Sequence, residues 1–189
     1  MTALSDAPHL EVDDPAMWRA WLEAHHAPAT GVWLVMNRRD ARTRLYEATV
    51  EEALCFGWVD STAGRVDDDR GKLYFAPRKP RSVWAASNKA RVERLIADRR
   101  MMPAGLAAIQ RAKTNGSWEL LDSVERLEIP PDLAAALATT TPAAVNFDRW
   151  TPGLRKQALG WIAQARRPET RSQRIARIAD FATRNVRPF

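Results

Sequence analysis

The stretch FAPRKPRSVWAASNKARVERL, from Phe75 to Leu95, separates two kinds of sequence pattern in this chain. Before it, short apolar runs bounded by glycine and turn-forming residues predict strands, the first being GVWLVMN at residues 31–37. After Pro80, apolar residues recur at helical spacing. We therefore predict an α+β protein, with a small, mainly antiparallel sheet and helices in the N-terminal half and an all-helical C-terminal part.

The N-terminal half also carries two helix signals. Asp14 followed by Pro15 is typical of an N-cap and a first helical residue. Thr49 and Glu52 have the spacing of a capping box and predict the start of a short helix that stops at Gly57. One helix is therefore expected before the first strand and another directly after it.

Three further strands are predicted between residues 58 and 77, with a tight turn at Ala63-Gly64 and a second turn in DDDRGK. Trp58 and Asp60 alternate on the first of these strands and should share a face. A carboxylate there needs either solvent or a cation, which Arg78 or Arg81 would supply if the strands are neighbours. Asp60 is then either part of a buried ion pair or a carboxylate that lines a pocket.

The second half of the chain is punctuated by residues that begin or end helices. Helices are predicted after Ser87, Pro103, Asp132, Pro152 and Thr170, the first with Val92, Leu95 and Ile96 on its inner face. We divide the chain into an α+β region (1–118), a connection (119–131) and a helical region (132–189).

Composition limits the classes of protein to which the chain can belong. It has a formal net charge of +6, with 24 arginines and 5 lysines, and the positive excess lies at residues 77–100 and 166–187. Arginine suits anion binding, although GC-rich coding favours it equally. No apolar run approaches the ~18 residues of a membrane span. A single cysteine and an N-terminus without an apolar core predict a cytoplasmic protein.

Several kinds of catalytic or cofactor site lack their motifs. His25 and His26 are adjacent rather than four residues apart, so no zinc pattern is present, and neither a phosphate-binding loop nor a nucleophile elbow occurs. Cys55 lies among apolar residues, where a thiol is usually buried and inert. We predict no metal and no cofactor.

The stretch from Phe75 to Leu95 carries all the candidate ligand-binding residues except Asp60. Its basic side chains surround Trp84 and follow two prolines that keep the chain extended. They form either a solvated helix face or a patch for an anion or a nucleic acid, and positive charge at a helix N-terminus needs an acidic partner or a bound anion. The candidates are Asp60, Arg78, Arg81, Ser82, Trp84, Asn88 and Arg91.

Several long segments resemble a known family. ALCFGWVDS, APRKPRSVWAASNKARVERLI, MMPAGLAAIQRAK and FDRWTPGLRKQALGWIAQARRPETRSQRIARIADF are similar to the YdeI/OmpD-associated family, which is often labelled bacteriocin-protection, over about residues 14–183. Arg100 stands where members of that family usually have glycine. The resemblance implies a bacterial stress or protection role and transfers no catalytic residue.

Three functions follow from these patterns. The favoured one is a non-enzymatic protein that binds an anionic small molecule or a protein partner between Asp60 and the loop Arg78–Trp84, with Arg91 at its edge. The second is a nucleic-acid-associated protein that uses the basic surfaces. The third is an enzyme with Asp60 as acid or base. We expect a monomer or a homodimer.

Overall fold

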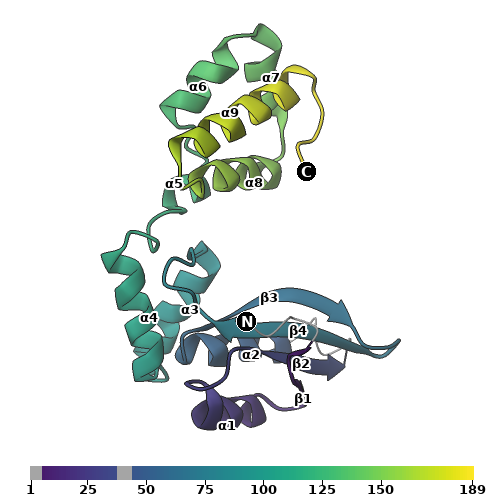
Figure 1. The fold of residues 1–189 in the computed structure, drawn as a ribbon, viewed down its shortest axis with the longest axis vertical. Helices are drawn as coiled ribbons and strands as arrows, with labels where there is room; N and C mark the ends of the chain where they lie inside the picture. The colour runs from purple at the N-terminus through teal and green to yellow at the C-terminus, as the bar shows by residue number, and fades with distance from the viewer. Residues whose placement is uncertain (1–5, 38–43) are drawn as a thin grey trace. The chain divides into compact units, whose positions relative to one another are not determined.

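The computed structural model describes residues 6–37 and 44–189 and has the predicted α+β composition (Figure 1). The chain divides into two compact units, Met1–Ser117 and Trp118–Phe189. The first unit contains the sheet and four helices in its described part, and the second is helical throughout. Each unit has its own core, so each is described by itself.

The sheet of the first unit is mixed rather than purely antiparallel. Its strands are β1 (His9–Glu11), β2 (Val32–Asn37), β3 (Trp58–Arg65) and β4 (Arg70–Pro77), in the order β1-β2-β4-β3. The β2–β4 and β3–β4 pairs are antiparallel, whereas β1 pairs parallel to β2. The sequence did not predict β1, because a strand of three residues is too short to show an alternating pattern.

The predicted turn at Ala63-Gly64 is wrong, because β3 continues through both residues. Instead of a turn, this part of β3 has a shift in its register with β4, between Asp60 and Ala63. The hairpin turns instead at the second predicted position, where the Asp67 carboxylate accepts the amide protons of Asp69 and Arg70.

Four helices accompany the sheet: α1 (Pro15–His25), α2 (Arg44–Cys55), α3 (Ala86–Ala97) and α4 (Pro103–Thr114). Asp14 caps α1 as predicted, by accepting the amide proton of Ala16. The proposed capping box is wrong, because Thr49 lies inside α2 and its hydroxyl donates to the carbonyl of Tyr46. Ser87 is also not a cap, since α3 begins after Ala85.

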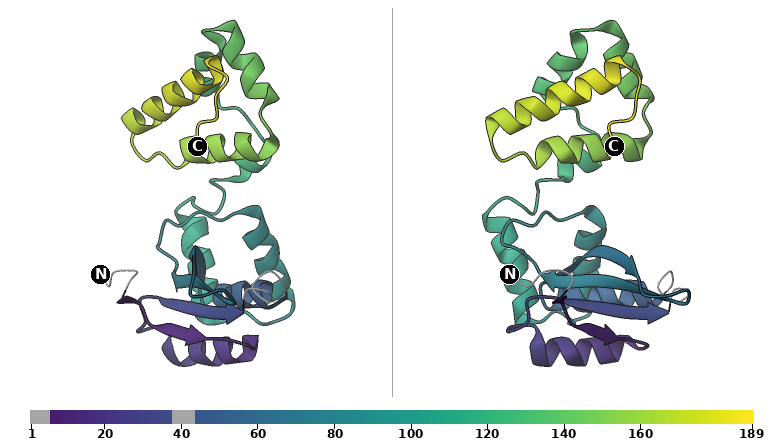
Figure 2. Two further views of the ribbon diagram at one scale, coloured as in Figure 1. Left: turned by 90° about the vertical axis from the view of Figure 1, so that its right-hand side faces the viewer. Right: turned by 45° about the vertical axis from the view of Figure 1, so that its right-hand side comes forward.

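Tryptophans form the centre of this core, with α1 lying against the sheet (Figure 2). The ring of Trp18 on α1 contacts Trp58 and Phe75, which come from β3 and β4. The indole nitrogen of Trp18 donates to the carbonyl of Thr49, which ties α1 to α2. A buried indole that keeps its hydrogen bond contributes apolar area without leaving a polar atom unpaired.

The residues that follow α2 and α3 both adopt the left-handed backbone conformation, but only the first of them is a glycine. Gly57 follows α2 in the left-handed region, with φ 74°, as its place in the sequence predicts. Gly105 of α4 lies so close to the carbonyl of Cys55 that a side chain would clash there. After α3 the left-handed position belongs to Arg99, with φ 57°, so Arg100 itself does not take that conformation.

The second unit packs five helices around one apolar core in Trp118–Phe189. They are α5 (Asp122–Glu125), α6 (Pro131–Ala138), α7 (Thr141–Arg149), α8 (Pro152–Ala163) and α9 (Pro168–Thr183). The sequence analysis did not predict α5 or α7, and α9 begins at Pro168, two residues before the predicted Thr170. The fully buried side chains at the centre include Leu133, Phe147, Ile162 and Ile178.

Helix length and polarity bear on membrane insertion. Across the described residues, no helix combines the length and the apolar character that crossing a bilayer requires.

Candidate anion-binding site

Strand pairing brings the two ends of the candidate site together. In the β3–β4 hairpin, Trp58 pairs with Pro77 and Asp60 pairs with Phe75. Arg78 directly follows the last residue of β4, and its backbone N–H donates to the carbonyl of Gly57 at 2.9 Å. The register of the hairpin therefore fixes Arg78 at the end of the sheet where β3 begins.

The side chain of Arg78 is buried and incompletely paired. The residue is 7% exposed, and its guanidinium carbon lies 3.8 Å from the centroid of the buried Trp84 ring. Nη1 donates to the carbonyl of Val83 at 3.2 Å. Nε and Nη2 are buried and have no hydrogen-bond partner in the described part of the chain. Burial lowers the pKa of Arg78 to about 10, and the Asp60 carboxylate opposes that shift, so the group is still a cation at neutral pH.

Asp60 is half-buried and is held by a tyrosine rather than by an arginine. The hydroxyl of Tyr46 on α2 donates to Oδ2 of Asp60 at 3.3 Å. Burial raises the pKa of Tyr46, and the Asp60 charge raises it further, so the phenol remains a donor. Among the described residues no ion pair joins Asp60 to Arg78 or Arg81, so Asp60 influences Arg78 only through its field.

Arg91 and Asn88 form a separate, fully paired arrangement. Nε and Nη2 of Arg91 each donate to one carboxylate oxygen of Glu47 at 2.9 Å. Nη1 of Arg91 donates to the side-chain oxygen of Asn88 at 3.0 Å. Arg91 is therefore neutralised by α2, and the acidic partner that its position in the first turns of α3 requires is Glu47.

The remaining two candidates lie on the turn between Arg78 and Trp84. The backbone N–H of Ser82 donates to the carbonyl of Lys79, which closes this turn. Arg81 is exposed and Ser82 is half-buried. The structure thus brings together Asp60, Arg78 and Trp84, joins Asn88 to Arg91, and leaves Arg81 outside both groups.

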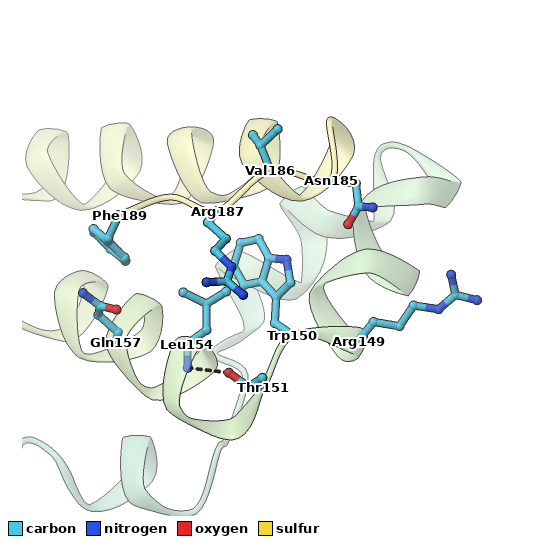
Figure 3. Close-up of a pocket in the computed structure, with 9 residues that line it drawn as sticks. All are labelled: Arg149, Trp150, Thr151, Leu154, Gln157, Asn185, Val186, Arg187 and Phe189. Atoms are coloured by element: carbon cyan, nitrogen blue, oxygen red, sulfur yellow. Dashed lines mark hydrogen bonds between the residues drawn. The ribbon is translucent and has the colours of Figure 1, made fainter.

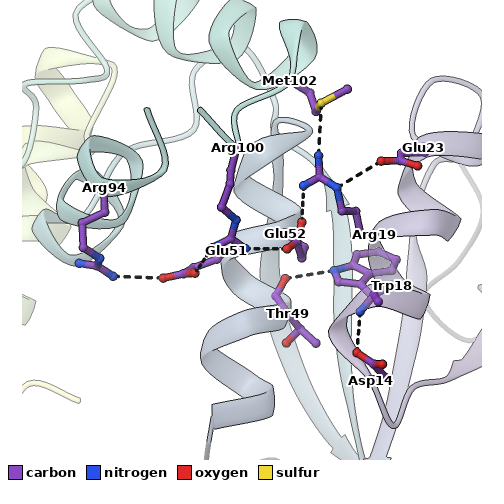
Figure 4. A network of polar contacts seen from close by, with 11 residues as sticks. Asp14, Trp18, Arg19, Glu23, Thr49, Glu51, Glu52, Arg94, Arg100 and Met102 are labelled. Atoms are coloured by element: carbon purple, nitrogen blue, oxygen red, sulfur yellow. Dashed lines mark hydrogen bonds and ion pairs between the residues drawn. The ribbon is translucent and has the colours of Figure 1, made fainter. Parts of the chain in front are cut away.

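A network of acids and arginines occupies the other end of α2 (Figure 4). The buried Glu52 accepts from Nη1 of Arg19 at 2.7 Å and from Nη2 of Arg100 at 2.6 Å. Glu51 pairs with both Arg94 and Arg100. The network links α1, α2, α3 and the segment before α4, so its role is to hold these elements together.

Cys55 lies next to this network, and its thiol is expected to be unreactive at neutral pH. It is fully buried, and burial raises the pKa of its thiol to about 11, with the Glu52 charge adding to the shift. A thiol with such a pKa is almost entirely protonated at neutral pH and is a poor nucleophile. Within residues 6–37 and 44–189, no cluster of His, Cys, Asp and Glu side chains has the form of a metal site.

Sequence reasoning missed the acidic and phenolic partners of the candidate site. Glu47 and Glu51 are four residues apart and therefore share one face of a helix, a spacing that was visible in the sequence. The capping-box pattern of Thr49 and Glu52 hides that signal, because it places the start of the helix after Glu47. Tyr46 has no such signal, because its contact with Asp60 depends on how α2 packs on β3.

The fold and the site together define an α+β protein with a buried, partly unpaired arginine beside a carboxylate. Residues 10–108 match a family described as a domain of unknown function (DUF8412), and residues 126–185 match the family described as Bacteriocin-protection, YdeI or OmpD-Associated. The chain belongs to the first family, whose match spans just over half of it, and the second match covers 60 residues of its C-terminal region. This confirms the predicted resemblance within residues 126–185. No curated protein and no solved structure matches the chain.

Proposed function

We propose that this chain is a non-enzymatic stress or protection protein that binds a small anionic ligand through the unpaired edge of Arg78. The observation that carries the proposal is the pair of buried nitrogens, Nε and Nη2, that lack a hydrogen-bond partner among the described residues. The name of the C-terminal family supports the protection role. Two family matches on one chain, at residues 10–108 and 126–185, also support separate N-terminal and C-terminal functional regions, although the second match begins inside the proposed connection at residues 119–131.

The unpaired atoms lie on the edge of the guanidinium that binds carboxylates elsewhere in this protein. Arg91 uses Nε and Nη2 to hold Glu47, and Arg171 uses the same two atoms to hold Asp132. Such side-on, bidentate geometry suits carboxylate and phosphate groups. A buried charged donor without a partner destabilises the folded protein by about 1–3 kcal/mol or more. An oxyanion bound at this edge would supply the missing hydrogen bonds and remove that destabilisation.

Asp60 narrows the class of ligand. Its carboxylate lies close enough to act on Arg78 and would repel a bare anion of high charge. A ligand that combines an oxyanion with an N–H or O–H donor avoids this, because the donor can bind Asp60 while the oxyanion binds Arg78. Amino acids and hydroxy acids have this combination, so we propose a ligand of that class.

Access to Arg78 would occur at the turn formed by Lys79 and Ser82. Lys79, Pro80 and Arg81 are exposed, and the segment is tied to Arg78 through the bond from Nη1 to the carbonyl of Val83. A small displacement of this turn would open the Nε–Nη2 edge. Arg81 is then an access residue and not a binding residue, so the variant that tests the proposal replaces Arg78.

Nucleic-acid binding by the basic stretch is the less favoured function. Arg91, Arg94 and Arg100 are all paired with glutamates of α2. Paired arginines release few counterions when they meet a phosphate backbone. The ring of Trp84 is buried and stacked on Arg78, so it offers no free face to a base.

The test is a thermal-shift screen of the full chain against amino acids, hydroxy acids, simple carboxylates and inorganic phosphate. We expect a few amino or hydroxy acids to raise the melting temperature, since binding to the native state alone stabilises by about 2.7 kcal/mol at 100 times Kd. Arg78→Met should abolish the shift, while Arg81→Ala should retain it. The proposal fails if no compound shifts the wild type, or if the shift survives in Arg78→Met.

A further inference from the structure

A cavity lies wholly within the Trp118–Phe189 unit, between the C-terminal segment and the junction of α7 and α8 (Figure 3). Its volume is about 370 Å³, within the range of small-molecule sites. It belongs to a different unit from Arg78, so it is independent of the proposed function. The lining residues include Arg149, Trp150, Leu154, Gln157, Asn185 and Arg187.

The charged side chains that line this cavity are all positive. Its lining contains two arginines and no acidic residue. Neither Arg149 nor Arg187 forms an ion pair with any residue that the structure describes. The N-terminal end of α8 also lines the cavity, with the Thr151 hydroxyl accepting the amide proton of Leu154. A helix N-terminus adds positive potential, so both arginine side chains and the end of α8 favour an anion.

The two arginines differ in direction. The guanidinium of Arg187 points down between Trp150 and Leu154, whereas the side chain of Arg149 extends away from the other lining residues (Figure 3). Arg187 is therefore placed to contact a ligand inside the cavity. Arg149 contributes charge at its rim.

The remaining wall is suited to an apolar, planar group. The side chains of Trp150 and Leu154 provide apolar surface beside the guanidinium of Arg187, whereas the Val186 side chain points away from them (Figure 3). Gln157 and Asn185 supply amide groups at opposite ends of the cavity. Sites of this kind typically combine apolar walls with a few polar groups that fix orientation.

We propose that this cavity binds an organic oxyanion with a compact aromatic or apolar body. The oxyanion, a carboxylate or a phosphate, contacts Arg187, and the body lies against Trp150 and Leu154. The ligand class differs from that of the Arg78 site, where Asp60 requires a hydrogen-bond donor on the ligand. One chain therefore carries two anion sites with different selectivity.

Isothermal titration of the full chain in phosphate-free buffer tests this proposal, with phenylacetate and phenyl phosphate as probes. The neutral 2-phenylethanol and the cationic phenethylamine are matched for their aromatic body. We expect both anions to bind at least tenfold more tightly than either control, and their relative affinities distinguish carboxylate from phosphate as the preferred group. Loss of a charge-assisted hydrogen bond weakens binding by about tenfold or more, so Arg187→Gln should show that loss.

Three variants separate this site from other causes. Arg149→Gln should change the affinity less than threefold, because the side chain points away from the cavity. Arg166→Gln, at an exposed arginine outside the lining, should change nothing. Arg78→Met should retain full affinity for both anionic probes. A negative result for the Arg187 cavity can therefore be distinguished from a negative result for the Arg78 site. Equal binding of 2-phenylethanol, unchanged affinity in Arg187→Gln, or no binding of either anion would overturn the proposal.

Discussion

Arg91 and Arg78 lie in the same basic stretch, yet the two arginines differ in what faces their Nε–Nη2 edge. At Arg91 that edge holds the carboxylate of Glu47. At Arg78 the same edge is buried without a hydrogen-bond partner in the part of the chain that the structure describes. An arginine-rich sequence therefore does not by itself indicate anion binding. Only an arginine that is not already paired with an acidic side chain is available to bind an anion.

The cause of the difference is the position of α2. Its glutamates at 47, 51 and 52 face α3 and the segment before α4, where they neutralise Arg91, Arg94 and Arg100. Beside Arg78, α2 instead places Tyr46, which is neutral and binds Asp60. One helix thus satisfies the cations on one side and leaves the cation on the other side without a salt bridge.

The largest effect is expected from Glu52→Gln, which removes the charge that Arg19 and Arg100 share. Breaking a fully buried ion pair costs about 3–5 kcal/mol. Arg19 and Arg100 are 29% and 37% exposed in their side chains, so water partly compensates. We expect a loss of about 2 kcal/mol in the free energy of unfolding, measured by urea denaturation.

Glu51→Gln is the matched control for that variant, since it removes an adjacent glutamate that pairs with two arginines as well. Glu51 is more exposed than Glu52, and its partner Arg94 is 59% exposed in its side chain. Exposed pairs contribute about 0–1 kcal/mol, so the loss should stay below 1 kcal/mol. Equal losses in the two variants would contradict the role given to burial.

Arg78→Met should have a much smaller effect on stability, although Arg78 is as buried as Glu52. The variant loses the bond to Val83 and the contact with Trp84, but it also removes a desolvated cation. Replacing a buried charge with an apolar side chain of similar volume is often neutral or stabilising. We expect urea denaturation to give a value within about 1 kcal/mol of the wild type. A loss above 2 kcal/mol would instead assign Arg78 a purely structural role.

Patterns local in sequence predicted much of the fold. Asp14 and Pro15 marked the start of α1, and Gly57 marked the end of α2, because caps depend only on neighbouring residues. The α+β composition followed from the change in pattern after Pro80. Ile96 was wrongly placed on the inner face of α3 and is 48% exposed, since the spacing alone did not define the edge of the buried stripe.

Features that depend on packing were not visible in the sequence. The parallel pairing of β1 with β2 joins two strands that are separated in the sequence by α1. Asp60 and Arg78 were expected to be close only if their strands are neighbours, a condition that the β3–β4 pairing meets. The bond from Tyr46 and the burial of Arg78 were not predicted. The cavity at Arg187 joins residues of α7, α8 and the C-terminal segment, so no single motif encodes it.

The smallest expected effect on stability concerns Arg171, a paired arginine of the second unit. Lowering the pH removes the negative charge of its partner, the Asp132 carboxylate. Arg171 donates to both carboxylate oxygens of Asp132, and this hydrogen bonding lowers the pKa of that carboxyl below its ordinary value. A carboxyl with a depressed folded-state pKa stabilises the protein above the unfolded-state pKa of about 3.9, and the stabilisation is lost as pH falls through the folded-state value.

Arg171→Gln should therefore lower stability by about 0.5 kcal/mol at pH 7, the size typical of a partly exposed pair. The difference from the wild type should narrow as the pH falls through the depressed pKa of Asp132, because the carboxyl is then increasingly protonated in both proteins. Urea denaturation at pH 7 and at a series of lower pH values measures this trend, and Arg166→Gln provides the charge-matched control. A difference that stays constant as the pH falls would show that Arg171 acts through packing, and the contrast between paired and unpaired arginines would then rest on the first unit alone.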